Sequence, residues 1–247
     1  MLNNKRAIIT GAGSGLGEAI AELYAGQGAR LSLVDRDSNA LQRVADNCRA
    51  QGAQVDLQIA DLGTADQPGQ AISRAIAALG GVDILVNSAG IATQGACADL
   101  TVELWDEMLA VDLRSVFLCC QAVLRPMQAR RWGRIINIAS QLGIKGAPEL
   151  SHYAAAKAGV LGFTKSLAQE MAPFNVLVNA IAPGPIETPM IAGISAEWKT
   201  AKAAQLPLGR FGRAEEVAPS ALLLASDPGG NLYVGQTLGP NSGDVMP

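Results

Sequence analysis

The sequence predicts an α/β protein in which helices wrap a parallel β-sheet. Short apolar runs rich in β-branched residues alternate with helical patterns along the chain, as in sheets of this kind. The chain has 247 residues, of which 49% are hydrophobic, enough for one large core. No internal repeat, low-complexity tract or linker divides it, so we expect residues 1–247 to form a single domain.

Six runs are the clearest strand candidates. They are RAIIT (6–10), RLSLVD (30–35), QVDLQIAD (54–61), VDILVN (82–87), RIINIAS (134–140) and NVLVNAIAP (175–183). Each run is almost continuously apolar, so we expect both faces of the sheet to be buried. A seventh strand is expected near LYVGQTL (232–238).

Helical periodicity is visible between these strands. It is clearest over residues 16–28, 38–52, 70–81 and 153–171. Several of these segments end at a glycine, which suits a left-handed C-cap.

The segment from 183 to 212 departs from this rhythm. It is marked by glycine and proline and is longer than an ordinary connection. It also carries Ile186, Met190, Ile191, Ile194 and Trp198. We therefore expect a partly helical lid over a site, at about residues 185–210.

Composition excludes several classes of function. The net charge of −3 and the scattered basic residues argue against a nucleic-acid partner. No run approaches the ~18 apolar residues of a membrane span, and the first residues are too polar for a signal peptide. Cys48, Cys97, Cys119 and Cys120 contain no CxxC pair, and His152 is the single histidine, so no metal site is expected. We expect a cytoplasmic protein with reduced thiols.

The stretch TGAGSGLG (10–17) predicts a nucleotide-binding turn because it joins the first strand to a helix. Its glycines allow the backbone to approach a phosphate, and the helix N-terminus attracts a pyrophosphate. We assign Gly11, Ser14, Gly15, Leu16 and Gly17 to this turn. The spacing is GxxxGxG instead of the commoner GxGxxG, which indicates a subclass of dinucleotide site.

Asp35 ends the second strand, 18 residues after Gly17. An acidic residue near this offset accepts the ribose hydroxyls of NAD and repels the extra phosphate of NADP. Arg36 could accommodate that phosphate, but Ser14 in the turn is not basic. We therefore expect NAD, with NADP as the less favoured cofactor.

Two further motifs end parallel strands, at the rim where ligands bind in such sheets. Asp61 and Leu62 end the third strand, where an adenine would lie. NSAG, with Asn87, Ala89 and Gly90, ends the fourth. We expect both motifs to line the cofactor site.

Ser140, Tyr153 and Lys157 form the sharpest catalytic candidate. Ser140 ends the fifth strand, and Tyr153 and Lys157 lie one turn apart on the same face of the following helix. A neighbouring ammonium group lowers the pKa of a phenol from about 10, which allows general acid/base chemistry nearer neutral pH. His152 points away around the helix and is expected to have a surface or packing role.

Five motifs in this order resemble the short-chain dehydrogenase/reductase family over essentially the whole chain. They are TGAGSGLG, NSAG, Ser140, YAAAK (153–157) and PGPIET (183–188). The resemblance implies a Rossmann-type, doubly wound sheet of seven mostly parallel strands. It also implies hydride transfer between a nicotinamide and a carbonyl or secondary alcohol, in a homotetramer or dimer formed through the helices around 103–130 and 152–172.

The resemblance assigns roles to individual residues. It implies that Tyr153 is the acid/base, that Lys157 favours its phenolate and holds the nicotinamide ribose, and that Ser140 positions the substrate oxygen. Asp61 and residues 87–90 would line the adenosine half of the cofactor. The nicotinamide half would contact Pro183, Gly184 and Thr188, and Ile186 is also assigned to the cofactor site.

Two positions depart from the family pattern. The family usually has NNAG where this chain has NSAG, a change that keeps Asn87. Asp112, inside the apolar stretch LAVDLRSVFLCC, occupies the position of a catalytic asparagine that helps to hold water near the lysine. Asp112 either replaces that amide with little effect, which we favour for activity, or pairs with Lys157 and shifts the activity optimum to higher pH.

The substrate is the least determined property. We expect an NAD-dependent enzyme acting on a secondary alcohol or ketone, with an apolar substrate part under the lid and a polar or acidic group near Gln141 or Lys145. The first alternative is a 3-oxoacyl thioester reductase using NADPH. A non-catalytic NAD sensor is less favoured because such proteins typically lack the tyrosine or the lysine. Related epimerases and dehydratases generally add a C-terminal domain for which this chain has no room.

Overall fold

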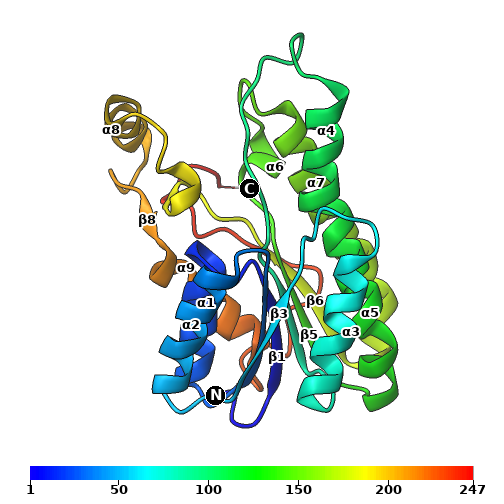
Figure 1. Cartoon of the computed structure of the whole chain (residues 1–247). Coiled ribbons are helices and arrows are strands. Elements are labelled where there is room, and N and C mark those ends of the chain that lie inside the picture. Colours follow the sequence, from blue (N-terminus) through cyan, green and yellow to red (C-terminus); the bar gives the residue numbers. More distant parts are fainter. Residues whose placement is uncertain (247) are drawn as a thin grey trace.

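We describe residues 1–246 from a computed structural model of the chain, which is built around a seven-stranded sheet (Figure 1). The sheet order is β3-β2-β1-β4-β5-β6-β9, and every pairing is parallel. The elements are β1 (Arg6–Thr10), α1 (Gly15–Gly26), β2 (Arg30–Asp35), α2 (Ser38–Ala50), β3 (Val55–Ile59), α3 (Gln67–Leu79), β4 (Ile84–Asn87), α4 (Val102–Leu109), α5 (Ser115–Arg130), β5 (Gly133–Ile138), α6 (Leu142–Lys145), α7 (Ser151–Met171), β6 (Val176–Ile181), β7 (Ile186–Glu187), α8 (Ala196–Gln205), β8 (Gly212–Arg213), α9 (Ala214–Ala225) and β9 (Thr237–Leu238). The predicted doubly wound sheet is therefore confirmed.

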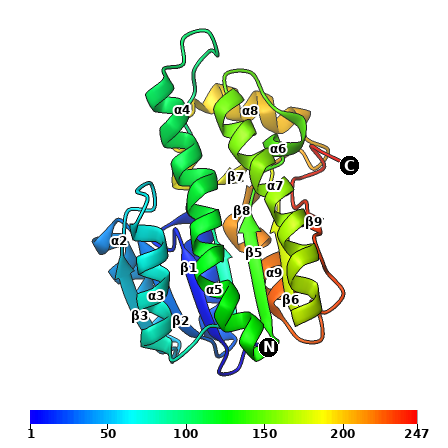
Figure 2. The same cartoon turned by 90° about the vertical axis from the view of Figure 1, so that its right-hand side faces the viewer.

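Helices cover both faces of the sheet. On one face, α1, α2 and α9 pack against alternate strand residues such as Ala7 and Ile9. On the other face, α3, α5 and α7 pack against residues such as Ile8 and Leu85 (Figure 2). The near-continuous apolar runs of the central strands follow from this two-sided burial.

The expectation of burial on both faces is wrong for β3. This strand is at the edge of the sheet, its residues are only partly covered, and Ile59 is exposed. The predicted strands 54–61, 134–140 and 175–183 also end earlier than expected, and only Thr237–Leu238 of the seventh run pairs. The last predicted residue of each of the runs 54–61, 134–140 and 175–183 lies beyond the paired residues and lines the cavity at the carboxyl ends of the strands.

A π-helical turn, Ala110–Arg114, joins α4 to α5. The helix expected around 103–130 is thus interrupted by one wider turn, and Asp112 lies in it, fully buried. Such turns are frequent at functional sites because they change the direction in which a side chain points. The apolar periodicity alone does not predict this interruption.

The segment 183–212 is partly helical, as predicted. It contains β7, a 3₁₀ turn at Pro189–Ile191 and α8, and β7 pairs with β8 in a small separate sheet. Figure 2 shows α6 and α8 at the end of the molecule toward which β5 points. No helix among residues 1–246 has the length and apolarity needed to cross a bilayer.

Candidate active site

A cavity of about 990 Å³ opens at the carboxyl ends of the parallel strands. The order of the sheet reverses between β1 and β4, and such a reversal leaves a crevice where ligands bind. The turn after β1 lines one part of the cavity, and Ser140, Tyr153 and Lys157 line another. The cavity therefore places a nucleotide turn beside a candidate proton-transfer site.

The turn between β1 and α1 requires glycine at two positions. Gly11 has φ +64°, and a Cβ there would lie 2.6 Å from the Cα of Ala89. A Cβ on Gly17 would lie 2.0 Å from the carbonyl oxygen of Gly11. Thr10 joins the turn to the fourth strand, because its Oγ1 accepts hydrogen bonds from the N–H groups of Ser88 and Ala89. This close packing leaves the first turn of α1 open to the cavity and suits a pyrophosphate.

Asp35 is held at the end of β2 by the backbone. Its Oδ2 accepts from the N–H of Gly13 at 2.9 Å and its Oδ1 accepts from the N–H of Asp37 at 3.0 Å. A carboxylate has about four acceptor sites, so each oxygen retains capacity for a ribose hydroxyl. Arg36 also lines the cavity, with an exposed side chain. Gly13 is not one of the predicted site residues, although it lies within the nucleotide-binding turn (10–17).

Most of the predicted cofactor residues line this cavity. They are Gly11, Ser14, Gly15, Leu16, Asp35, Arg36, Asp61, Leu62, Ala89, Gly90, Tyr153, Lys157, Pro183, Gly184, Ile186 and Thr188. Gly17 and Asn87 do not line it. Gly17 backs onto Gly11, and the buried Asn87 side chain donates to Asn137 at 2.9 Å, so both support the cavity wall.

Lys157 is buried on α7, and its Nζ lies 5.6 Å from the centre of the Tyr153 ring. The ammonium donates to the carbonyl oxygen of Ile138 at the end of β5, at 3.2 Å. Ser140 follows that strand, and its Oγ accepts from the N–H of Leu142 at 3.1 Å. Strand β5 and helix α7 thus bring Ser140, Tyr153 and Lys157, three of the four predicted catalytic residues, to the same cavity.

Asp112 lies behind Lys157 and does not line the cavity. Its Oδ2 is 3.0 Å from the Lys157 Nζ, and its Oδ1 accepts from the N–H of Ile91 at 2.8 Å. Burial disfavours the Lys157 cation, but the charges of Asp112 and Tyr153 outweigh this effect and raise the pKa of Lys157 above its usual value. The ion pair between Asp112 and Lys157 is therefore present. The shift of the activity optimum to higher pH that we expect from this pair stays a prediction.

Gly90 and Gly143 pack closely around this pair. A Cβ on Gly90 would lie 3.0 Å from Oδ2 of Asp112 and 3.4 Å from Nζ of Lys157. A Cβ on Gly143 would lie 2.7 Å from the carbonyl carbon of Lys157, so α6 rests directly on the backbone of α7. Gly143 was not a predicted site residue, because its role depends on the packing of two helices.

His152 is fully buried, so a surface role is excluded and the packing role holds. Its Nε2 is 2.8 Å from the Oγ1 of Thr93. This contact ties α7 to the loop that follows β4. His152 does not line the cavity.

Sequence reasoning missed the C-terminal wall of the cavity. A Cβ on Gly184 would lie 2.6 Å from the Cα of Asn241, so the segment after β9 packs directly on the PGPIET motif. Asp244, in the same segment, also lines the cavity. No local pattern around Asp244 signals this position, since its partners lie up to 103 residues away.

Comparisons with known proteins agree with this arrangement. A family model described as short chain dehydrogenase matches residues 5–199. The 3-oxoacyl-[acyl-carrier-protein] reductase FabG of Vibrio cholerae serotype O1 is 41% identical over 246 residues, covering 99% of each chain. A short-chain type dehydrogenase/reductase from Mycobacterium marinum superposes with a TM-score of 0.94 at 34% identity, covering 100% of this chain and 97% of that one. Levodione reductase gives a TM-score of 0.94 at 32% identity, covering 98% of both chains.

Proposed function

Because the chain belongs to the short-chain dehydrogenase/reductase family of oxidoreductases, which bind a nicotinamide cofactor, we propose that it transfers a hydride between NAD(H) and a secondary alcohol or ketone. The observation that carries this proposal is the shared cavity, in which Ser140, Tyr153 and Lys157 stand beside the nucleotide turn. The cofactor supplies or accepts the hydride. The chain has to bind the substrate oxygen and move a proton.

Tyr153 is proposed as the group that exchanges this proton. In alcohol oxidation its phenolate takes the hydroxyl proton, and in ketone reduction its hydroxyl gives a proton to the oxygen. The ammonium of Lys157, 5.6 Å from the ring centre, favours the phenolate. Ser140 donates a hydrogen bond to the substrate oxygen and so orients it. We expect Lys157 also to hold the nicotinamide ribose.

The preference for NAD is proposed from Asp35. Its carboxylate lies at the strand end where the adenosine ribose would bind, and it is oriented by two backbone N–H groups. A ribose diol can donate to it, whereas the 2′-phosphate of NADP would be repelled. Arg36 follows Asp35 in the chain and also lines the cavity, and its positive charge would favour NADP instead.

The main alternative is reduction of 3-oxoacyl thioesters with NADPH. It is supported by the names of relatives such as the Vibrio cholerae enzyme, 41% identical to this chain. Steady-state kinetics should compare secondary alcohols, hydroxy acids and 3-hydroxyacyl thioesters with NAD and with NADP. A higher kcat/KM with NADP would overturn the cofactor proposal, and a thioester as the best substrate would favour this alternative.

A non-catalytic sensor is tested with Tyr153→Phe. We expect this variant to lose at least about a hundredfold in turnover while it still binds NAD, because the proton-transfer group is removed and the nucleotide turn is intact. If the wild-type protein turns over no alcohol or ketone and still binds NAD tightly, the enzyme proposal fails.

A homo-oligomer is proposed from the helices α4, α5 and α7. Val102, Trp105 and Phe117 are exposed on α4 and α5, and the Phe117 ring meets Phe163 of α7 edge-on. Exposed aromatic residues on adjacent helices are typical of protein interfaces. Sedimentation of the wild type and of Phe117→Glu tests this, since a tetramer or dimer should dissociate in the variant.

A further inference from the structure

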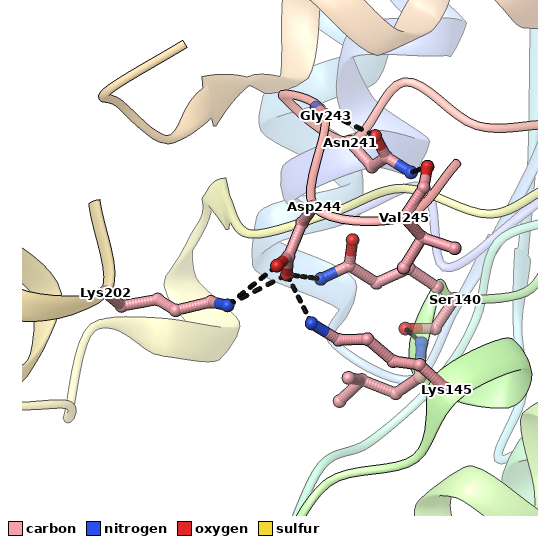
Figure 3. Close-up of polar contacts among 9 residues, drawn as sticks. Ser140, Lys145, Lys202, Asn241, Gly243, Asp244 and Val245 are labelled. Carbon is pink, nitrogen blue, oxygen red and sulfur yellow. Dashed lines mark hydrogen bonds and ion pairs between the residues drawn. The ribbon is translucent and has the colours of Figure 1, made fainter. Parts of the chain in front are cut away.

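Two lysines, Lys145 and Lys202, point toward the carboxylate of Asp244 (Figure 3), and the side chain of Gln141 also donates to it. Oδ2 of Asp244 accepts from Nε2 of Gln141 at 2.6 Å and from Nζ of Lys145 at 2.7 Å. The Nζ of Lys202 lies 3.0 Å from Oδ1 and 2.9 Å from Oδ2. One carboxylate is therefore held by three donors.

These donors come from separate parts of the chain and meet in the catalytic cavity. Gln141 and Lys145 belong to the segment that follows Ser140, and Lys202 lies on α8 of the predicted lid. They line the same cavity as Ser140 and Tyr153, as does Asp244. The cluster therefore borders the space available to a substrate.

The cluster is partly shielded from solvent and carries an excess of positive charge. The side chains of Asp244, Lys202 and Lys145 are 10%, 18% and 32% exposed, and Gln141 is buried. Two ammonium groups share a single carboxylate here. Burial opposes the ionisation of Asp244, but hydrogen bonds from Lys145, Lys202 and Gln141 outweigh it and lower the pKa of this carboxyl group.

Asp244 reaches the cluster from a turn outside the sheet. The turn is closed by hydrogen bonds from Asn241 Nδ2 to the carbonyl oxygen of Val245, at 2.7 Å, and from the N–H of Gly243 to Oδ1 of Asn241, at 3.0 Å. Residues 239–246 contain no helix or strand. The turn is attached to its surroundings by hydrogen bonds from the N–H groups of Gly184 and Leu208 to the carbonyl oxygens of Pro240 and Ser242, and not by a strand pairing.

We propose that Gln141, Lys145 and Lys202 form a carboxylate subsite of the substrate cavity, in which Asp244 competes with the carboxylate of an acidic substrate, an oxo or hydroxy acid. The position of Asp244 demonstrates that the donors fit a carboxylate. Trp198, which also lines the cavity, supplies an apolar surface for the carbon chain. This inference rests on the proposed oxidoreductase function of the same cavity.

The first test measures binding without turnover. Butyrate cannot be reduced at this site, so calorimetric titration of the enzyme with NAD bound reports the subsite alone, and butyramide is the neutral probe. We expect Asp244→Asn to tighten butyrate binding about tenfold, because the competing charge is removed and both lysines remain. Butyramide binding should not change. Asp46→Asn, on the exposed face of α2, is the matched control.

The converse variant removes the subsite. Lys145→Met together with Lys202→Met should abolish the preference for butyrate over butyramide, and thermal unfolding with NAD verifies that this variant is folded. An unchanged affinity for butyrate in Asp244→Asn would overturn the proposal. The proposal would also be overturned if the double variant lost the same amount of affinity for butyrate and for butyramide, since the lysines would then only shape the cavity.

Turnover gives the second test. The substrates are oxo acids of increasing chain length, and each acid is compared with its methyl ester. At one chain length, the acid should have a higher kcat/KM than the ester. Asp244→Asn should raise the ratio of the two kcat/KM values, acid over ester. If neither acids nor esters react, the proposed function fails, while the calorimetric result still decides the subsite. If esters react and the ratio is the same in both proteins, the subsite proposal fails alone.

Discussion

Replacing Asp112 by asparagine separates the two interpretations of this carboxylate. The substitution keeps the shape of the side chain and can keep the hydrogen bond from the N–H of Ile91, but it removes the negative charge 3.0 Å from Lys157. Without this charge, the positive field of Lys157 acts on Tyr153 with less compensation. A negative charge that forms on the phenol oxygen is therefore better stabilised in the variant, so alcohol oxidation should reach its full rate at lower pH.

The size of this effect follows from the geometry. Lys157 Nζ lies 3.0 Å from Asp112 and 5.6 Å from the ring centre of Tyr153. Together, these two distances mean that the Asp112 carboxylate lies at most roughly 9 Å from the centre of the Tyr153 ring. At this separation, the repulsion between two unit negative charges is about 1.8 kcal/mol for an effective dielectric constant of about 20. We therefore expect the pH midpoint of alcohol oxidation to fall by about one unit.

The assay is the pH dependence of kcat/KM for NAD-linked oxidation in both proteins. The NAD dissociation constant at each pH controls for a changed cofactor site. Breaking the buried pair should also lower the free energy of unfolding, by up to about 3 kcal/mol, which urea unfolding measures. Superimposable pH profiles in two folded proteins would refute the reasoning and leave Asp112 as a simple replacement for an amide.

Three other predictions concern cofactor binding and thiol reactivity. Asp35→Ala should lower kcat/KM with NAD about tenfold or more, because a charged acceptor of the ribose hydroxyls is lost. The kcat/KM with NADP should fall less, and an equal fall with both cofactors would contradict this prediction. Gly17→Ala should reduce the unfolding free energy by about 1–3 kcal/mol and weaken NAD binding, because its Cβ would overlap the carbonyl of Gly11, and calorimetry with thermal unfolding checks both. An aromatic disulfide reagent at pH 8 should label Cys97 but not Cys119 in the native protein, since Cys97 is exposed and burial raises the pKa of Cys119 to about 12; rapid labelling of both would contradict the fold.

The central strands and the nucleotide turn could be predicted because local residues carry their signals. Two-sided burial makes the inner strands almost continuously apolar, and the turn needs glycine at Gly11 and Gly17. The strand ends could not be placed from the same signal, because Ala60, Ala139 and Ala182, which directly follow the last paired residues, are apolar like the residues of the ladder. The exposed edge at β3 was missed because the order of strands is a tertiary property.

The residues of the candidate site that lie on one helix could be predicted, because Tyr153 and Lys157 are four residues apart and so share one face of that helix. The ion pair of Lys157 with Asp112 was weighed only because Asp112 stands where an asparagine was expected, and the π-helical turn that buries it has no signal in the apolar pattern. Asp244 was missed altogether. Its partners Lys145 and Lys202 lie on α6 and α8 and approach it only in the folded chain, so no local pattern connects them.

The contact of Gly143 with the backbone of Lys157 has a consequence for how this protein can diverge. Helix α6 rests so closely on α7 that any larger residue at Gly143 would displace the helix and disturb Lys157. Substitutions at Gly143 are therefore a poor route to new substrates. Changes at Lys202 and Asp244, which lie outside helices α6 and α7, should be the more accessible route by which descendants of this sequence alter their substrate range while retaining their proton-transfer chemistry.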